Sequence, residues 1–255
     1  MSAEALVIIP TYNEAENVGP LVRAVLAQRL NLEILIVDDN SPDGTGAIAD
    51  RLAGELPAVH VLHRRGKEGY GTAYVAGCRW ALSRDYRLVL SMDCDFSHHP
   101  GYLPDLLARA CDADLVIGSR YIAGGGTANW GVGRRLLSAG ANLLVRVALG
   151  LRVHDCTAGF RCFRREMVER IPWEEIGLTG YGFLVGVVYQ VQRLGGRIAE
   201  VPIIFEDRRV GRSKMSPQIM AEGLAFVTRL AYRRGRAAGA RWRARRHGEP
   251  KSVDG

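Results

Sequence analysis

The chain has 255 residues, of which 47% are hydrophobic and 24% are charged, and its formal net charge at pH 7 is +7. These values exclude a chain that is disordered throughout, and the length favours one large α/β domain over two small ones. The positive charge favours anionic partners such as nucleotide diphosphates, lipid phosphates, acidic membranes or nucleic acid.

Cysteine use and hydropathy indicate where the protein works. The five cysteines are odd in number and include no C-x-x-C pair, which argues against a disulfide framework and against a zinc cluster. No apolar run approaches the roughly 18 residues that a membrane-spanning helix needs, and the first residues lead directly into a strand pattern. We therefore expect a cytoplasmic protein that is peripheral on the inner face of a membrane.

Short runs of β-branched residues alternate with helical stretches from the start of the chain. This pattern predicts an α/β fold with a mostly parallel central sheet and helices on both faces. The first helix is expected to open at Asn13, with Glu16 three residues on as in a capping box. A later helix is expected near residues 134–149. The expected strands are residues 5–10, 33–38, 59–63, 87–92, 114–119 and 197–205.

The C-terminal part of the chain is strongly basic. A basic loop at residues 206–214 precedes an amphipathic helical pattern at 218–232 and an arginine-rich stretch. We expect one folded domain over residues 1–216, a basic amphipathic helix over 217–236 and a disordered basic tail over 237–255. Such a helix can lie on an anionic membrane or pack on the domain with a solvated basic end. Nucleic acid is a weaker alternative, and we expect no nucleic-acid partner.

Asp93 and Asp95 flank one residue at the end of a buried apolar run. Ligands of parallel sheets sit beyond the carboxyl ends of the strands, so both carboxylates can converge there on one hard cation. A Mg²⁺ or Mn²⁺ ion held by one or two carboxylates keeps positions open for diphosphate oxygens. The alternative is a pair of turn-forming or helix-capping aspartates, and the D-x-D pattern alone does not decide between the two.

Acidic and aromatic residues follow the first two predicted strands. Asp39 can accept hydrogen bonds from a base or a ribose hydroxyl, whereas helix capping is the preferred interpretation of Asp43. Tyr12 can stack against a nucleobase and Glu14 can accept from it. Glu14 can equally complement the dipole of the helix that follows, so its role stays open at this point.

Basic residues are predicted at the same edge of the sheet. Arg120 follows the fifth strand, Arg134 opens the next helix, and Arg208 and Lys214 lie in a glycine-containing loop. Guanidinium forks match the geometry of phosphate groups. A solvated surface role is the alternative for any one arginine, and clustering favours phosphate contacts for Arg208 and Lys214.

Several other motifs are missing. Residues 69–72 lack the third glycine of a dinucleotide fingerprint, and the chain has no G-x-x-x-x-G-K-[ST] loop, which argues against a dehydrogenase and a P-loop enzyme. His98 and His99 have no third spaced Cys or His ligand. We therefore expect them to pack the loop or to support other ligands rather than to bind zinc.

Taken together, these motifs resemble the dolichyl-phosphate (polyprenol-phosphate) mannosyltransferase family. The resemblance runs from about residue 5 to residue 216, which is most of the chain. The segments that carry it are PTYNE at 10–14, VDDNSPDGT at 37–45, DCDFSHHP at 93–100, GSRY at 118–121 and the R-x-x-G-x-S-K pattern at 208–214.

The resemblance implies a GT-A fold and an inverting, metal-dependent transfer of mannose from GDP-mannose to a polyprenyl monophosphate. Asp95 and Arg120 are then the catalytic positions, and Arg120 and Arg134 face the acceptor phosphate. Asp93, Asp95 and Ser97 are the metal positions. Some relatives have glutamine at the position of Ser97, so the serine is expected to reach the ion through water. The nucleotide-sugar positions are Pro10, Tyr12, Glu14, Val37, Asp39, Asp93, Cys94, Asp95, Arg208 and Lys214.

Two other functions stay open. One is transfer of another sugar from the same scaffold, such as glucose from UDP-glucose to a lipid phosphate, because one carboxylate near a base does not distinguish guanine from uracil. The other is a non-catalytic module that its tail recruits to a membrane, although such a module need not keep Asp93, Asp95 and Arg120. The missing membrane-spanning run also leaves room for a separate membrane-anchoring subunit.

Overall fold

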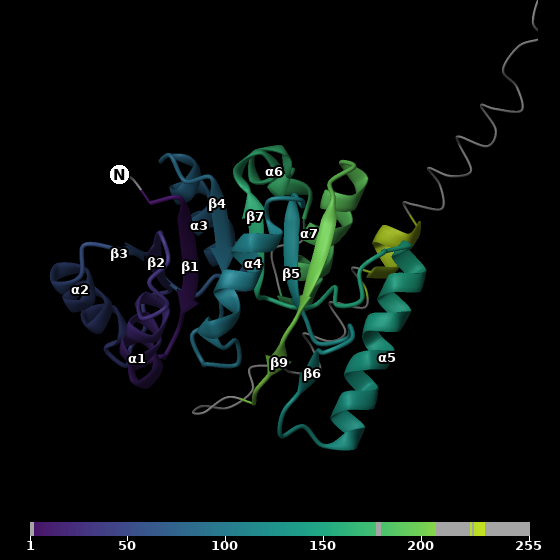
Figure 1. The fold of residues 1–255 in the computed structure, drawn as a ribbon, viewed down its shortest axis with the longest axis horizontal. Helices are drawn as coiled ribbons and strands as arrows, with labels where there is room; N and C mark the ends of the chain where they lie inside the picture. The colour runs from purple at the N-terminus through teal and green to yellow at the C-terminus, as the bar shows by residue number, and fades with distance from the viewer. Residues whose placement is uncertain (1–2, 177–179, 208–224, 226, 233–255) are drawn as a thin grey trace, which may run out of the picture.

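The computed structural model describes residues 3–176, 180–207, 225 and 227–232. Its centre is a sheet of seven strands in the order β3-β2-β1-β4-β7-β5-β8 (Figure 1). Neighbouring strands are parallel, except that β7 is antiparallel to β4 and to β5. The strands are β1 (Ala5–Thr11), β2 (Leu32–Asp38), β3 (Val59–His63), β4 (Leu88–Ser91), β5 (Leu115–Ser119), β7 (Arg161–Arg164) and β8 (Ile198–Pro202).

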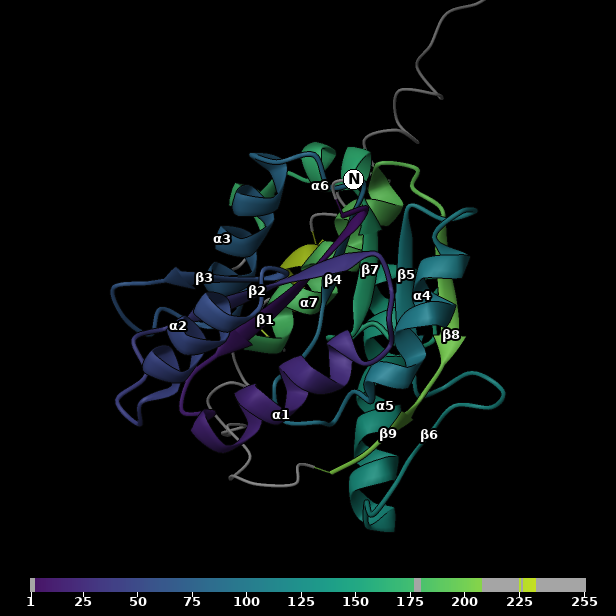
Figure 2. The ribbon, with the colours of Figure 1, turned by 60° about the vertical axis from the view of Figure 1, so that its left-hand side comes forward.

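Helices cover both faces of this sheet (Figure 2). The first face is covered by α1 (Ala15–Leu26), α2 (Thr45–Glu55) and α4 (Leu103–Arg109). The second face is covered by α3 (Tyr70–Leu82), α6 (Arg165–Arg170) and α7 (Gly180–Arg193). Two 3₁₀ turns occur at Pro100–Tyr102 and Trp173–Glu175, and Trp173 packs into the core of the second face. The predicted α/β fold, a mostly parallel sheet between helical layers, is confirmed.

The alternation of side chains along β1 explains the two cores. Leu6 and Ile8 belong to the core on the α3 side, whereas Val7 and Ile9 belong to the core on the α1 side. Successive residues of a strand point to opposite faces, so a strand covered on both sides must be apolar throughout. All four side chains are fully buried.

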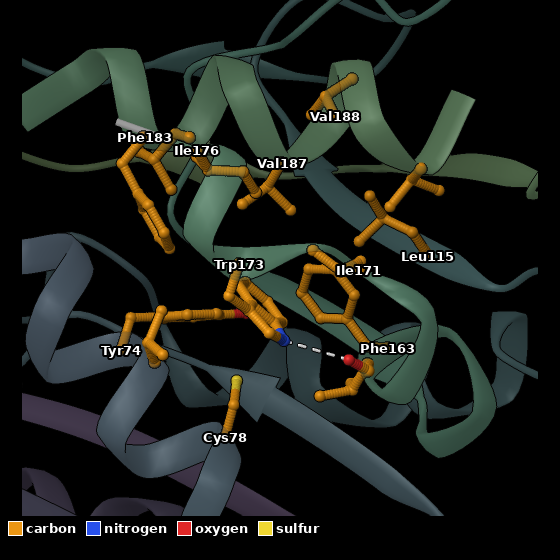
Figure 3. Close-up of a cluster of buried hydrophobic side chains, with 14 of the residues drawn as sticks. Tyr74, Cys78, Leu115, Phe163, Ile171, Trp173, Ile176, Phe183, Val187 and Val188 are labelled. Carbon is orange, nitrogen blue, oxygen red and sulfur yellow. Dashed lines mark hydrogen bonds between the residues drawn. The ribbon is translucent and has the colours of Figure 1, made fainter. Parts of the chain in front are cut away.

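Aromatic rings fill the core between α3, β7 and α7 (Figure 3). The ring of Tyr74 lies 5.4 Å from that of Phe183, 6.1 Å from that of Trp173 and 6.3 Å from that of Phe163. The indole N–H of Trp173 donates to the carbonyl oxygen of Val168 at 3.1 Å, so its polar atom is satisfied in the core.

The structure corrects the sequence-based expectations at two strands. β7 was not predicted, because Arg161–Arg164 is short and has an arginine at each end. The expected strand 197–205 divides into β8 and β9 (Ile204–Phe205), and β9 pairs with β6 (Gly126–Thr127) in a separate two-stranded sheet. The chain leaves β8 at Pro202, which has no N–H to continue a ladder.

The first helix begins at Ala15, so the capping box expected at Asn13 is wrong. Asn13 has a left-handed backbone with φ 57° and lies outside the helix. Asp43 supplies the cap instead, because its carboxylate accepts from the N–H of Ala15 and from the N–H of Thr45, each at 3.0 Å. One aspartate thus satisfies backbone donors at the starts of α1 and α2, which agrees with the capping role expected for it.

The long helix α5 (Val132–Leu149) stands at the edge of the molecule, beside β6 and β9 (Figure 1). It begins two residues before the expected range. In the basic helix expected at 217–236, the described residues 227–232 are helical, and Val227 and Leu230 are buried in the core. This part therefore packs on the domain, and the remainder of that prediction lies outside the described residues.

Candidate active site

The loops after β1, β2, β4 and β5 open at one edge of the sheet because these strands are parallel. β1 and β4 are neighbours whose connections leave in opposite directions, which is where ligands of open α/β sheets bind. Three of these loops contain a non-glycine residue with positive φ, namely Asn13 (57°), Asn40 (57°) and Phe96 (61°). Asparagine adopts this conformation readily, whereas phenylalanine does so only where its surroundings hold it.

The loop after β4 carries the two aspartates of the predicted metal site. Asp95 is buried, and its Oδ1 accepts from the N–H of Ser97 at 3.1 Å, while Asp93 is partly exposed. The hydroxyl of Ser97 is buried and has no hydrogen-bond partner among the described residues. Two carboxylates with an unpaired hydroxyl nearby form an oxygen donor set, which suits Mg²⁺ or Mn²⁺.

No group of three or more His, Cys, Asp or Glu side chains that could hold a metal occurs in the part of the chain that the structure describes. A cation held by Asp93 and Asp95 would leave coordination positions for a substrate phosphate, a hydroxyl or water. Such open coordination is what a cation that contacts a diphosphate requires.

His98 supports the backbone of this loop. The N–H of Asp93 donates to Nδ1 of His98 at 3.2 Å, and the imidazole stacks on Phe160 with ring centroids 5.1 Å apart. Burial lowers the pKa of His98 despite the nearby Asp93 and Asp95 carboxylates. The ring is therefore neutral, and its 3.9 Å approach to the Asp93 carboxylate is not an ion pair.

The segment before β7 lies directly against Asp93. A Cβ atom on Gly159 would lie 3.4 Å from Oδ1 of Asp93 and 3.1 Å from the hydroxyl oxygen of Tyr70. The hydroxyl of Ser91 donates to the carbonyl oxygen of Gly159 at 2.6 Å, which fixes this approach. Tyr70 and Gly159 were not predicted as site residues, because only the fold brings them to Asp93.

Asp39, the predicted nucleotide contact after β2, forms a buried ion pair. Nη1 of Arg64 donates to Oδ1 of Asp39 at 2.6 Å. Burial raises the pKa of Asp39, and Arg64 only partly offsets this effect. The neighbouring Asp38 accepts from Thr11 Oγ1 at 3.0 Å and from Ser41 Oγ at 2.6 Å, so it holds the loops together. Arg64 was missed because it lies 25 residues from its partner.

Tyr12 and Glu14 both lie in the loop after β1, where the sequence placed them. The ammonium nitrogen of Lys67 is 4.3 Å from the centre of the Tyr12 ring. The N–H of Glu14 donates to Thr45 Oγ1 at 2.9 Å, and its carboxylate accepts from Asn17 Nδ2 at 2.9 Å. Glu14 occupies the N-cap position of α1, which is consistent with the helix-terminus role left open for it.

Three further predicted nucleotide-sugar positions belong to the framework of the site. Pro10 lies beside Val37 in the register of β1 and β2, and Val37 is completely buried. Cys94 is also buried and packs in the apolar core on the α1 side. These residues shape the ends of β1, β2 and β4.

Arg120, directly after β5, is bound by a buried carboxylate. Its Nε donates to Oδ2 of Asp155 at 2.7 Å, and its Nη2 donates to Oδ1 at 2.8 Å. Burial would raise the pKa of Asp155, but the hydrogen bonds and the charge of Arg120 outweigh this effect and hold the pKa below its ordinary value. Asp155 was not predicted as a site residue.

The guanidinium groups of Arg134 and Arg120 both lie near the indole ring of Trp130. Cζ of Arg134 is 4.0 Å from the centre of the Trp130 ring, and Cζ of Arg120 is 5.8 Å from it. Arg134 also pairs with Asp207, whose carboxylate accepts from Nη1 at 3.0 and 3.1 Å. Phe205 packs edge-on against Trp130 with centroids 5.5 Å apart, and it contacts Arg120 as well. The structure thus brings both predicted acceptor-side arginines together.

Arg208 and Lys214, the predicted residues of the basic loop, lie outside the described residues. Their roles stay predictions.

The chain belongs to glycosyl transferase family 2, whose family model matches residues 6–172. This membership makes it a glycosyltransferase. It is 48% identical over 225 residues to the undecaprenyl-phosphate mannosyltransferase of Micrococcus luteus, covering 88% of this chain and 92% of the relative. It is 46% identical over 230 residues to the polyprenol monophosphomannose synthase of Mycolicibacterium smegmatis, covering 89% and 87%. The predicted family is confirmed.

Solved structures show the same fold at low sequence identity. The glucosyl-3-phosphoglycerate synthase of Mycobacterium tuberculosis, solved with Mn²⁺, UDP and glucosyl-3-phosphoglycerate, has a TM-score of 0.66 at 19% identity, with 90% of this chain and 80% of that one covered. The mannosyltransferase PcManGT of Pyrobaculum calidifontis, solved with GDP-Man and Mn²⁺, has a TM-score of 0.57 at 18% identity, with 97% and 76% covered. The predicted GT-A fold is confirmed.

Proposed function

We propose that the protein transfers mannose from GDP-mannose to a polyprenyl monophosphate with inversion, using Mg²⁺ or Mn²⁺ held by Asp93, Asp95 and Ser97. The two relatives that are nearly half identical are both named for mannose transfer to such lipid phosphates. The structural observation that carries the proposal is the placement of Arg120. The Phe205 ring lies 5.4 Å from its Cζ and 5.5 Å from the ring of His98, whose Nδ1 accepts from the N–H of Asp93. Phe205 thus links Arg120 to the loop that carries Asp93.

The acceptor's chemistry explains why no catalytic base is needed. A phosphate monoester is already an anion at neutral pH, so one of its oxygens can attack the anomeric carbon without losing a proton to a side chain. The bond from that carbon to the nucleotide diphosphate breaks, and its electron pair leaves with the diphosphate. When bound, the divalent ion supplies positive charge to the departing diphosphate.

The chain's own residues then have to align the two reactants. Arg120 and Arg134 hold the acceptor phosphate opposite the leaving diphosphate, and holding the attacking oxygen in line lowers the barrier. Asp95 is the carboxylate that we expect to be most indispensable, since it is buried and its loop is fixed by the N–H of Ser97. Arg208 and Lys214 are assigned to the donor's sugar-phosphate side by resemblance.

On the donor side, Asp39 and Glu14 accept hydrogen bonds from the base or the ribose, and Tyr12 with Lys67 flanks the nucleotide. Proteins of this fold have been solved with UDP and with GDP-Man, so the fold does not choose the base. The mannose in the names of the two relatives favours GDP-mannose. UDP-glucose is the alternative donor to test.

A lipid acceptor requires contact with a membrane surface, and α5 is suited to make it. Six of its apolar side chains are at least half exposed, and Arg134, Arg135 and Arg146 lie on the same helix. Apolar burial in the headgroup region together with basic residues is how interfacial helices bind anionic bilayers. Among the described residues, no helix is long and apolar enough to cross a bilayer. We propose peripheral attachment through α5, at the cytoplasmic face.

The test is mannose transfer from radiolabelled GDP-mannose to a polyprenyl phosphate in phosphatidylglycerol vesicles, with Mg²⁺ or Mn²⁺ and with EDTA as the metal-free arm. Metal-dependent formation of mannolipid, lost in Asp95→Asn and kept in Asp105→Asn on α4, is the expected result. Transfer from UDP-glucose alone would keep the mechanism and change the donor. Absence of transfer from either donor would contradict the proposal.

A further inference from the structure

The carboxylate of Asp155 is completely buried and binds Arg120 from behind. It accepts from Nε, from Nη2 and from the backbone N–H of Arg120, at 2.7, 2.8 and 3.1 Å. The Arg120 side chain keeps 8% exposure whereas that of Asp155 keeps none. Asp155 is therefore the more deeply buried member of the pair, and Arg120 is the one that keeps some exposed surface.

A second layer of hydrogen bonds fixes this pair. Thr157 Oγ1 accepts from Nη2 of Arg120 at 2.8 Å and from Nδ2 of Asn142, on α5, at 3.1 Å. The other end of the Asn142 amide accepts from the N–H of Cys156 at 3.1 Å. The groups that hold Arg120 are thus fixed by further hydrogen bonds. One of the residues that fix them, Asn142, belongs to α5, the helix that we assign to the membrane surface.

The topology of the sheet brings these groups together. Because β7 is antiparallel between β4 and β5, the segment that enters it starts at the edge where Arg120 leaves β5. Glu200 on β8 anchors that segment by accepting from the N–H of His154 and of Asp155, each at 2.9 Å. The order of the strands in this sheet therefore places Arg120 and Asp155 next to each other.

We propose that Asp155, assisted by Thr157 and Asn142, is the positioning residue that orients Arg120 toward the acceptor phosphate. The inference rests on the proposed function, in which Arg120 binds that phosphate. A guanidinium held at two of its nitrogens cannot rotate among rotamers, so its remaining surface meets the phosphate in one orientation. An ion pair buried in this way stabilises a fold little more than apolar side chains do, so its placement beside the site points to a role in function.

The test is a double-mutant cycle of Arg120→Ala, Asp155→Asn and the double variant, assayed for mannose transfer in the vesicle system. If Asp155 acts through Arg120, each single change lowers kcat by about 100-fold, as misplacement of a reacting group does. The double variant then loses no more than Arg120→Ala alone. GDP-mannose binding, measured by calorimetry with Mn²⁺, stays within a factor of about two in all three.

Added guanidinium chloride at low millimolar concentration separates positioning from a general structural effect. Arg120→Ala keeps the Asp155 carboxylate that can hold a free guanidinium, so its activity should rise several-fold. The double variant, which lacks that carboxylate, should show no rise. Multiplying losses in the cycle, or equal responses of the two variants to guanidinium, would overturn the inference.

Two further variants separate the positioning role from misfolding and from a failure of the proposed mannose transfer. Thr157→Val removes the hydroxyl that accepts from Nη2 of Arg120 and from Asn142 but leaves the Asp155 carboxylate in place. It keeps the shape of the side chain and should lower kcat by a smaller factor than Asp155→Asn. Glu169→Gln breaks an exposed Arg165–Glu169 pair on α6 and should leave transfer unchanged. Wild-type protein without transfer would contradict the proposed function itself, whereas active wild type with an active Asp155→Asn would contradict only the positioning role.

Discussion

The guanidinium of Arg134 lies over the indole ring of Trp130, with Cζ 4.0 Å from the ring centre. Phe205 and Arg120 lie near the same ring, with Phe205 edge-on at 5.5 Å and Cζ of Arg120 at 5.8 Å. The indole is buried and its N–H has no hydrogen-bond partner among the described residues. Trp130 therefore connects the start of α5 with the end of β5 through aromatic and cation–π contacts, which are each worth about 0.5–2 kcal/mol.

We expect Trp130→Ala to raise the KM for polyprenyl phosphate by about tenfold, because Arg134 then keeps only its pair with Asp207 and loses the ring that orients it. The KM for GDP-mannose should stay unchanged, since the Trp130 ring contacts Phe205 and the two acceptor-side arginines within the described part of the chain. Trp130→Phe keeps a ring and should be near wild type. Steady-state kinetics with each substrate varied in turn make the comparison. An equal rise in both KM values would contradict this reading of the ring.

The metal site makes a prediction with a binding readout. Asp95→Asn should weaken Mn²⁺ binding in the presence of GDP and lower kcat by at least about 10²-fold, because one charged ligand and its charge stabilisation are lost. Ser97→Ala should reduce Mn²⁺ affinity much less. Electron paramagnetic resonance of Mn²⁺ titrated into protein with GDP measures both effects. Unchanged Mn²⁺ affinity in Asp95→Asn would place the cation elsewhere.

The exposed face of α5 predicts vesicle binding. Leu136 and Leu143 are 68% and 58% exposed, so Leu136→Gln with Leu143→Gln should leave the thermal midpoint of unfolding nearly unchanged. Each lost leucine removes about 1.5–3 kcal/mol of apolar burial in the membrane, so co-sedimentation with phosphatidylglycerol vesicles should fall at least tenfold.

Ala108→Gln places the same amide on exposed α4 and serves as the control for that pair of substitutions. It should sediment with vesicles like the wild type. Equal sedimentation of the double variant and the wild type would show that α5 does not contact the membrane. The basic C-terminal segment would then be the next region to test.

The ion pair of Asp155 predicts how stability depends on pH. Its pKa in the folded chain is below that of the unfolded chain, so the pair stabilises the fold above the ordinary aspartate pKa of about 3.9 and loses this effect as the pH falls through the folded value. Asp155→Asn should lower the free energy of unfolding by about 3 kcal/mol at pH 7. Denaturant unfolding from pH 7 to pH 3 should show this difference constant above about pH 5 and narrowing below about pH 4. A difference that grows toward low pH would have the wrong sign.

The sequence by itself determined the parallel strands and the residues at their ends. Runs such as residues 5–10 are apolar throughout because both faces of the strand are covered, and that requirement is visible without a structure. The pair Asp93 and Asp95 was found for a related reason, since polar residues that directly follow a buried strand stand out from it. The five motifs at the strand ends and in the basic loop also carried the resemblance to the mannosyltransferase family to which the chain's relatives belong.

Tertiary structure alone decided which distant residues complete the site. The antiparallel strand β7, inserted between β4 and β5, brings Asp155 to Arg120 across 35 residues, and the ordering of β2 and β3 brings Arg64 to Asp39 across 25. Strand order is set by how whole layers pack, so no local pattern reports it. The same packing determines which groups pair with buried charges. The sequence therefore identified Arg120 and Asp39 at the strand ends, whereas only the fold revealed their partners, Asp155 and Arg64.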